Sequence, residues 1–432
     1  MPEPELLVEF DQPQEVFLPG HPISGRVILM TSESYKARAV HLKLDGRAHT
    51  SWHEYETERH TDANGNIENR QKKVDYSATV KYLETKILIW ASADGSNQLI
   101  PGTYVWPFSY RLPSNIPPSF EGKYGYIRYW VIAEVDRPWR FDKTSKRCIT
   151  VSPLLDLNFI SNAMTPLQDQ TSENLGCCCF KKGYLSVKLD IPKTGFVPGE
   201  TVPINLQIVN KSSVNVTMVT ATILQRCTFM AYRNGTTFNF TEISGVTRGE
   251  VKRNSNTVIT QTQPLTVEPG NSHNLALELR LPSVTPTINQ FSPVITVEYY
   301  VDVSVNSSTT FFSSIDCETS ILIGTVPIHQ YLPPSYYPPN PTLPTPYPIG
   351  NGVAPPPDYP SGSNSPPYPE VPYPFKTGGV IQPSAPPPSY QDSMYGTDGT
   401  HIHTEEHEKP FVPKYPVFNN LPVYNPSAPP QE

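Results

Sequence analysis

The sequence has no long hydrophobic run and no paired spacing of its cysteines. No apolar stretch approaches the roughly 18–20 residues of a membrane-spanning helix. Met1–Glu15 has neither a basic segment nor an apolar core, so we expect no secretory signal. The six cysteines follow no paired spacing, unlike those of a small secreted disulfide scaffold. These absences favour a protein of the reducing cytoplasm.

Strong charge and catalytic signatures are absent as well. The net charge is only −7, from 33 basic and 40 acidic residues, so no basic field favours nucleic acid as a partner. The chain has no Walker A sequence, no dinucleotide-binding glycine fingerprint and no Gly-x-Ser-x-Gly nucleophile. The sequence therefore predicts neither an enzyme nor a cofactor or metal site.

Short β-strand patterns fill the chain as far as Gln330. No long segment carries a 3.6-residue apolar period, and Gly, Pro, Asn and Ser separate the patterns. We therefore expect an all-β fold of antiparallel sandwiches. The clearest strands, rich in β-branched and aromatic residues, are Ile23–Met30, Ala39–Leu44, Tyr126–Val135, Thr201–Val209 and Val294–Val305.

This region is duplicated internally. Three pairs of segments match in the same order, at a separation too long for a solenoid, which indicates two homologous domains. The polar stretch Glu58–Lys73 accounts for extra residues in the first copy, and we expect it to be a long exposed loop. The matching pairs are Phe17–Gly20 with Phe196–Gly199, Arg111–Ser114 with Arg280–Ser283, and Ile127–Val135 with Val297–Val305.

The duplication and the composition divide the chain into four parts. Residues 1–155 and 183–328 are expected to be the two β-sandwich lobes. Residues 156–182 are expected to be a connector, with the polar stretch Thr165–Leu175 and a run of cysteines. Residues 329–432 are expected to be a disordered tail.

Three segments resemble hallmark sequences of the arrestin-domain-containing proteins, the alpha-arrestins. They are Ser119–Trp139, Gly195–Glu200 and Leu322–His329, and the resemblance covers roughly Pro4–His329. It implies an arrestin N-lobe and C-lobe, which are tandem immunoglobulin-like β-sandwiches. It also implies a cytoplasmic adaptor, recruited to the plasma membrane and endosomes, that binds membrane cargo such as receptors or transporters. Such an adaptor delivers a ubiquitin ligase to the cargo, which promotes its ubiquitination, endocytosis and endosomal sorting.

The tail has a composition of its own. It holds 28 of the 50 prolines and 11 of the 24 tyrosines, counted from Tyr331 to Glu432. Such a segment cannot bury enough apolar surface to offset its chain entropy. We therefore expect disorder with a polyproline II bias.

Three Pro-Pro-x-Tyr motifs lie in this tail. Polyproline II has three residues per turn, so the first proline and the tyrosine of each motif fall on one ridge. That ridge fits the aromatic groove of a WW domain and its tyrosine pocket, which predicts recruitment of WW-domain HECT-type ubiquitin ligases. The motif residues are Pro333, Pro334 and Tyr336, then Pro356, Pro357 and Tyr359, then Pro387, Pro388 and Tyr390.

Two further tail motifs and the cysteine run are candidates for other contacts. The tetrapeptides Pro383-Ser384-Ala385-Pro386 and Pro426-Ser427-Ala428-Pro429 have the form that ESCRT-I reads, so ESCRT-I is a candidate partner. Cys177, Cys178 and Cys179 could be S-acylated near a membrane or could be a tolerated part of the connector. Tyr415–Phe418 fits the Tyr-x-x-Φ endocytic form, which is very common.

Three other functions remain open at this point. A beta-arrestin-like receptor desensitiser would share the lobes, although the tail shows no acidic-aliphatic clathrin box. A coat or trafficking scaffold like the arrestin-fold subunit of retromer would also share them, but would have no use for three WW ligands. His403–His407 fits the H-x-x-E-H form of a metalloprotease, which requires a folded helix that a disordered tail does not supply.

Overall fold

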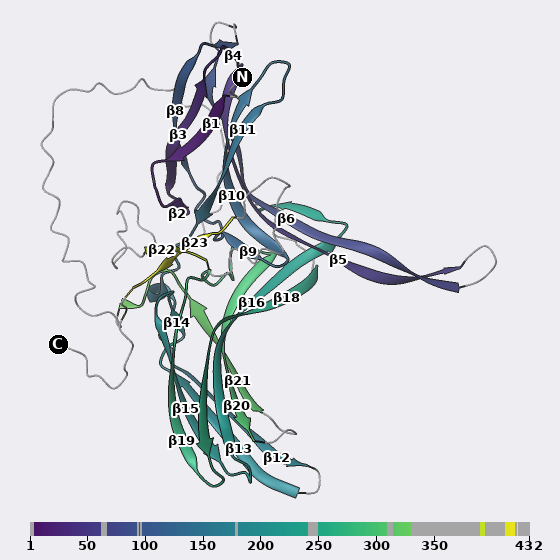
Figure 1. Ribbon diagram of the computed structural model, residues 1–432, viewed down its shortest axis with the longest axis vertical. Helices are drawn as coiled ribbons and strands as arrows, with labels where there is room; N and C mark the ends of the chain where they lie inside the picture. Colours follow the sequence, from purple (N-terminus) through teal and green to yellow (C-terminus); the bar gives the residue numbers. More distant parts are fainter. Residues whose placement is uncertain are drawn as a thin grey trace, which may run out of the picture.

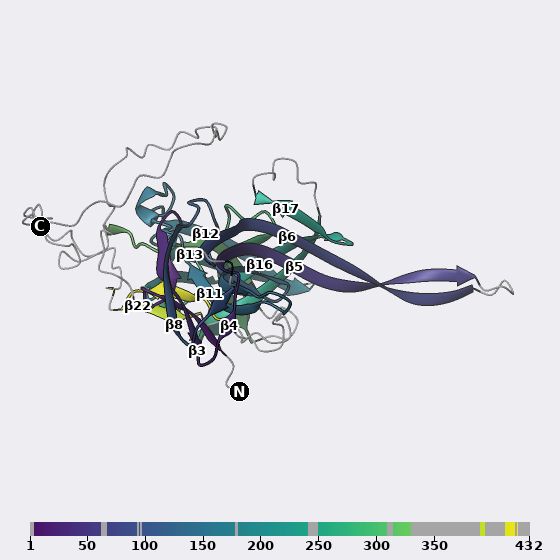
Figure 2. The same ribbon diagram turned by 90° about the horizontal axis from the view of Figure 1, so that it is seen from above.

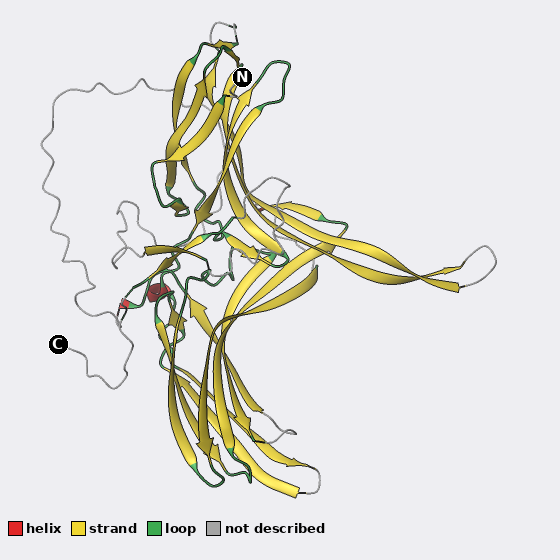
Figure 3. Ribbon diagram, viewed as in Figure 1, coloured by secondary structure: helices red, strands yellow, loops and turns green. Residues whose placement is uncertain are grey.

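The computed structural model describes residues 4–61, 67–92, 95, 97–177, 180–240, 249–308, 314–329, 389–393, 411–419 and 421. Strands make up nearly all of the regular structure in these ranges (Figure 3). Two elongated lobes meet at the middle of the molecule, and a long hairpin projects from the junction (Figure 1). Among the described residues, no helix is long and apolar enough to cross a membrane.

The first lobe pairs a three-stranded sheet with part of a larger sheet. Its strands alternate between buried and exposed residues, as in β3, where one face lies in the core. The small sheet has the order β1 (Glu5–Phe10), β3 (Pro22–Thr31), β8 (Gly102–Arg111). The larger sheet contributes β6 (Ile67–Ala91), β5 (Ala39–Thr61), β10 (Gly125–Asp136), β11 (Lys143–Val151) and β2 (Val16–Phe17), with β9 (Phe120–Gly122) beside β10. β4 (Tyr35–Lys36) and β7 (Gln98–Leu99) form a separate pair.

The second lobe repeats this plan. Its four-stranded sheet has the order β12 (Leu167–Cys177), β13 (Phe180–Ile191), β15 (Thr201–Asn210), β19 (Ser272–Arg280). The facing strands are β14 (Gly195–Phe196), β21 (Ser314–Ile323), β20 (Ile295–Ser307), β16 (Val216–Arg233) and β18 (Glu250–Val267). β17 (Thr236–Asn239) pairs with β6 of the first lobe, and the 3-10 turn η1 (Leu157–Phe159) lies between the lobes in sequence.

The structure confirms the internal duplication, because the repeated segments meet in the same way in each lobe. The amide of Gly20 donates to Leu112 O over 3.1 Å, and the amide of Gly199 donates to Leu281 O over 2.8 Å. A short strand pairs in parallel with the last long strand in both lobes, β2 with β11 and β14 with β21.

The lobes are joined by one continuous sheet. β16 pairs with β6 through Tyr232 and Ser77, so the strand order runs unbroken from β14 to β2. Thr50 Oγ1 of the first lobe donates to Met230 O of the second over 2.6 Å. Aromatic rings fill the space beside this pairing, with the Phe229 centroid 5.7 Å from that of Tyr124.

The structure differs from three predictions about connections in particular segments that it describes. Glu58–Lys73, predicted to be a loop, lies mostly on the two arms of the β5–β6 hairpin, although its described side chains are exposed as expected. Within the predicted connector 156–182, Leu167–Cys177 is strand β12, which pairs along its length with β13. Within the predicted disordered tail 329–432, β22 (Ser389–Asp392) and β23 (Lys414–Val417) form an antiparallel pair.

Candidate functional site

The β22–β23 pair from the tail lies against both lobes, near the point where they meet (Figure 1, yellow strands). Tyr390 of β22 is opposite Pro416 of β23 in the register. The residues that hold this pair are called the interlobe site below. They are Ser119, Thr150, Pro198, Gly199, Ser283 and Thr285.

Tyr415 links the two lobes through its hydroxyl. The side chain is fully buried, and the hydroxyl donates to Ser119 O of the first lobe over 2.5 Å. It accepts a hydrogen bond from Thr285 Oγ1 of the second lobe over 2.7 Å. Burial raises the pKa of Tyr415 well above its ordinary value, because the phenolate would lose its hydration. The neutral hydroxyl therefore acts as a bridge between the lobes.

The backbone of the same segment adds one contact to each lobe. The amide of Lys414 donates to Thr150 Oγ1 of β11 over 3.1 Å. The amide of Phe418 donates to Pro198 O of the second lobe over 2.9 Å. The Phe418 ring joins a small apolar cluster of buried residues formed with Leu157, Ala163, Val197 and Ile328.

Gly199 gives the Phe418 backbone room to approach. Its φ is +90°, and a Cβ added there would lie 2.0 Å from Phe418 O. A residue other than glycine would therefore meet both backbone strain and a clash with the tail. The requirement for glycine here comes from a close approach as well as from the turn.

A buried ion pair supports this turn. Lys193 Nζ bonds to Glu200 Oε1, and the two side chains are 1% and 8% exposed. The amide of Val197 donates to Glu200 Oε2 over 3.1 Å, so each oxygen of the carboxylate has a hydrogen-bond partner. Burial lowers the pKa of Lys193 and raises that of Glu200, while each partner opposes the shift of the other.

Two side-chain hydrogen bonds hold β22. Ser283 Oγ donates to Gln391 O over 3.2 Å, and Ser389 Oγ donates to Val417 O over 3.1 Å. Tyr390 is half-buried, and this burial raises the pKa of its hydroxyl.

Comparison with known proteins identifies the two lobes. Residues 6–158 match the family described as arrestin (or S-antigen), N-terminal domain, and residues 181–328 match arrestin (or S-antigen), C-terminal domain. The chain belongs to the alpha-arrestin family. The predicted resemblance and fold class are thus confirmed, and arrestin-domain relatives support a role as an adaptor in trafficking.

Curated relatives share the body of this alpha-arrestin. Arrestin domain-containing protein 17 of Caenorhabditis elegans is 28% identical over 323 residues, which cover 74% of this chain and 70% of the relative. Arrestin domain-containing protein 4 of Homo sapiens is 27% identical over 345 residues, 76% of this chain and 79% of its own length. Thioredoxin-interacting protein of Mus musculus is 30% identical over 247 residues, which cover 56% and 58% of the two chains.

Most of the binding residues that the sequence predicted lie outside the described residues. Of the nine WW-ligand positions, the structure describes Tyr390, which it places in β22. Cys177 ends β12, and Cys148, Cys227 and Cys317 of the described residues are in no disulfide. The predicted positions outside the described residues are Pro333, Pro334, Tyr336, Pro356, Pro357, Tyr359, Pro387, Pro388, Cys178 and Cys179, with both Pro-Ser-Ala-Pro tetrapeptides and His403–His407.

The interlobe site itself was missed by the sequence analysis. Tyr415–Phe418 was noticed for its endocytic form, but no local pattern pairs it with Ser119 or Thr285, which lie far away in sequence. The useful signal was the apolar content of Phe411–Phe418 within a tail otherwise rich in Pro, Ser and Gly.

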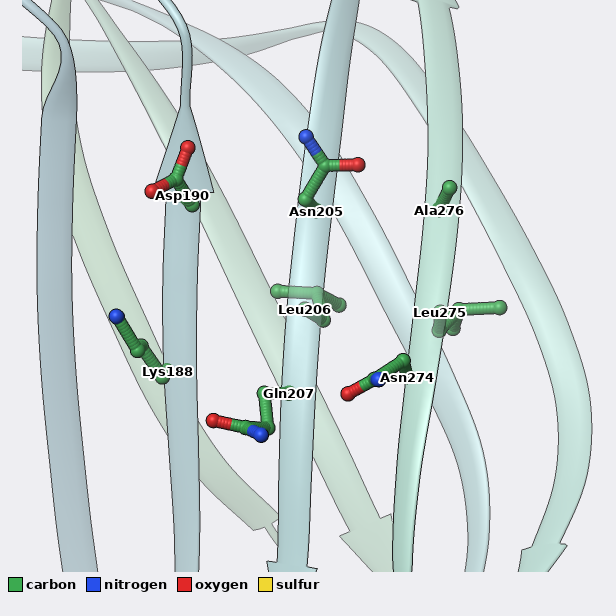
Figure 4. A pocket seen from close by; sticks show the side chains of 8 residues that line it. All are labelled: Lys188, Asp190, Asn205, Leu206, Gln207, Asn274, Leu275 and Ala276. Carbon is green, nitrogen blue, oxygen red and sulfur yellow. The ribbon is translucent and has the colours of Figure 1, made fainter. Parts of the chain in front are cut away.

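A polar depression on the second lobe is a weaker candidate (Figure 4). Its side chains stand on three adjacent strands, β13, β15 and β19, and Asp190 already accepts a hydrogen bond from Gln168 over 2.8 Å. Among the described residues, no group of three or more His, Cys, Asp or Glu side chains could hold a metal ion. The interlobe site is therefore the better candidate for function.

Proposed function

We propose that this alpha-arrestin recruits WW-domain HECT-type ubiquitin ligases to membrane cargo such as receptors or transporters. Ubiquitination, endocytosis and endosomal sorting of the cargo follow from that recruitment. The observation that carries the proposal is the joining of three Pro-Pro-x-Tyr motifs to an arrestin body in one chain. The lobes bind cargo, the tail binds the ligase, and the adaptor itself needs no catalytic residue.

The location and the further partner follow from the same role. The adaptor would work in the cytoplasm and would be recruited to the plasma membrane and endosomes by its cargo. The two Pro-Ser-Ala-Pro tetrapeptides would add ESCRT-I, which suits cargo that passes to endosomal sorting.

Spacing of the tyrosines favours multivalent binding. Tyr336, Tyr359 and Tyr390 are separated by 23 and 31 residues. A random-coil chain of 23 or 31 residues would span roughly 25–30 Å at about 5–6 Å × √n. Two motifs can therefore engage neighbouring WW domains of one ligase, with an effective concentration on the order of millimolar for the second contact.

Titration of a multi-WW ligase fragment against the full chain tests this function. We compare the wild type with single and double Tyr→Ala variants at Tyr336, Tyr359 and Tyr390. One lost tyrosine should weaken binding modestly, while two lost tyrosines should weaken it by more than the product of the single effects. Equal affinity for all of these chains would exclude ligase recruitment through the motifs.

A further inference from the structure

We propose that the interlobe site is a binding site for the chain's own segment Phe411–Asn419, and that its occupation withholds the third Pro-Pro-x-Tyr motif from WW domains. The consequence for the ligase rests on the proposed function. The docking itself rests on contacts alone. In the docked state, Tyr390 is part of a strand pair, and a WW domain must take it out of that pair.

The docked segment is bound by specific contacts along its length. Tyr415, Val417 and Phe418 are 0%, 4% and 5% exposed. Buried aromatic side chains remove a large apolar area from water, and the Tyr415 hydroxyl still finds two partners there. The C-terminal half of the segment is thus anchored by buried apolar side chains, and its buried hydroxyl has both hydrogen-bond partners.

The internal duplication shows that the Pro-Gly turn of the second lobe contacts the tail, while its counterpart in the first lobe does not. The Pro-Gly turn of each lobe has a positive φ, +76° at Gly20 and +90° at Gly199. A Cβ at Gly20 would meet Ser114 Cβ at an ordinary 3.5 Å, whereas a Cβ at Gly199 would meet the tail backbone at 2.0 Å. Ser283, the counterpart of Ser114, donates to Gln391 O of β22. In the second lobe, both Gly199 and Ser283 therefore contact the tail.

Docking and WW binding require different conformations of the same residues. Ser389 and Tyr390 are paired in register with Val417 and Pro416 of β23. Tyr390 is half-buried there, while a WW domain inserts the tyrosine ring into its own pocket and requires polyproline II. The two states compete, so binding of a WW domain must weaken docking by the same factor as docking weakens the WW domain.

The competition assigns a distinct role to the third motif. The docked hairpin contains Tyr390 but neither Tyr336 nor Tyr359. A ligase that engages the third motif also releases Tyr415, and with it the hydroxyl bridge between Ser119 and Thr285. Ligase loading is thereby coupled to the contacts between the lobes.

The test uses the full chain with Tyr336→Ala and Tyr359→Ala, so that among the three Pro-Pro-x-Tyr motifs only the third keeps the tyrosine that binds a WW domain. Phe418→Ala removes the ring from its apolar cluster, and Gly199→Ala places a methyl group against Phe418 O. We measure the affinity of a single WW domain for each chain. If docking holds about nine chains in ten, both variants should bind about tenfold more tightly, because apparent affinity scales with the competent fraction.

Gly20→Ala is the matched control. It carries the same strain of a positive φ in the equivalent turn, but it meets no tail atom. It should leave the WW affinity unchanged. Hydrogen exchange at the Phe418 amide, which donates to Pro198 O, should be about tenfold slower in the control than in Gly199→Ala, because the amide is protected only while the segment is docked.

The outcomes separate the two proposals. Loss of WW binding on Tyr390→Ala, with no gain from Phe418→Ala or Gly199→Ala, would overturn the docking inference and leave ligase recruitment standing. Fast exchange at Phe418 in the parent chain would overturn it as well. A reporter chain that binds no WW domain even with Phe418→Ala would contradict both the function of this motif and the inference.

Discussion

Arg128 and Glu121 form a charge pair that is almost wholly removed from water. The guanidinium donates to both carboxylate oxygens, over 2.6 and 2.8 Å, and the side chains are 3% and 11% exposed. The guanidinium carbon Cζ also lies 4.1 Å from the centroid of the Tyr126 ring. Burial raises the pKa of Glu121, and the hydrogen bonds and positive charge of Arg128 oppose this rise. Glu121 is two residues from Ser119, so the pair lies close to the point where Tyr415 meets the first lobe.

Breaking this pair should be strongly destabilising. Glu121→Gln leaves the guanidinium buried without a counter-charge, which costs about 3–5 kcal/mol in such settings. The matched control is Glu9→Gln, which breaks the Arg26–Glu9 pair, whose side chains are 56% and 42% exposed. That loss should stay within about 1 kcal/mol. Urea denaturation of the full chain measures both, and equal free energies of unfolding would contradict the argument.

The β5–β6 hairpin is the element that extends farthest from the body (Figure 2). Its register runs unbroken from Glu54–Val74 to Thr61–Ile67. Near its base, Glu56 and Glu54 form ion pairs with Arg233 and Lys252 of the second lobe. Beyond that point the described side chains are exposed on both faces. The outer part of the hairpin therefore adds little to the core.

Removal of the outer hairpin should leave the lobes intact. Thr57 is opposite Gln71, so residues 57–71 can be replaced by Asn-Gly, a two-residue turn that suits this geometry. Because the side chains of 57–60 and 67–71, which the structure describes, are exposed, the melting temperature should change by less than about 4 °C. Calorimetry measures it. A large fall would mean that the hairpin contributes to the core, contrary to its exposure.

Sequence patterns predicted the strands of the core. They did not predict the strands whose conformation depends on contacts with other parts of the chain. Strands such as β3 and β20 alternate regularly between apolar and polar residues, since one face is buried. β12 and the outer hairpin are polar on both faces, so their sequences gave no strand signal. Strand β23 contains Pro416, which has no backbone N–H to donate to a neighbouring strand. Its local sequence therefore argues against a strand. Its burial comes from distant residues that no local pattern reveals.

Among the functional residues too, the sequence predicted one part and missed another. WW-ligand motifs depend on a short contiguous sequence, so they can be predicted, and their use by a ligase stays a prediction. The interlobe site depends on Ser119, Thr285 and Tyr415, which come together only through the fold. Sequence also could not show that Tyr390 of the third motif would lie in a strand.

At the scale of the whole molecule, the lobes are more closely coupled than two tandem domains need to be. The sheet is continuous through Tyr232 and Ser77, and one buried apolar cluster extends through both lobes. Phe229 of the second lobe packs against Phe120 and Tyr124 of the first, at centroid distances of 6.3 and 5.7 Å. Loosely joined domains unfold separately, but a shared core makes unfolding cooperative.

The full chain should therefore unfold in one calorimetric transition. Phe229→Ala removes the ring that joins the lobes, at a cost of about 3–5 kcal/mol, and should split the transition in two. Leu189→Ala is the control, because Leu189 is equally buried but lies within the second lobe, on β13. It should lower the melting temperature while the transition stays single, since the contacts between the lobes are intact. Two transitions in the wild type, or an unsplit transition in Phe229→Ala, would show that the lobes do not share a cooperative core at this ring.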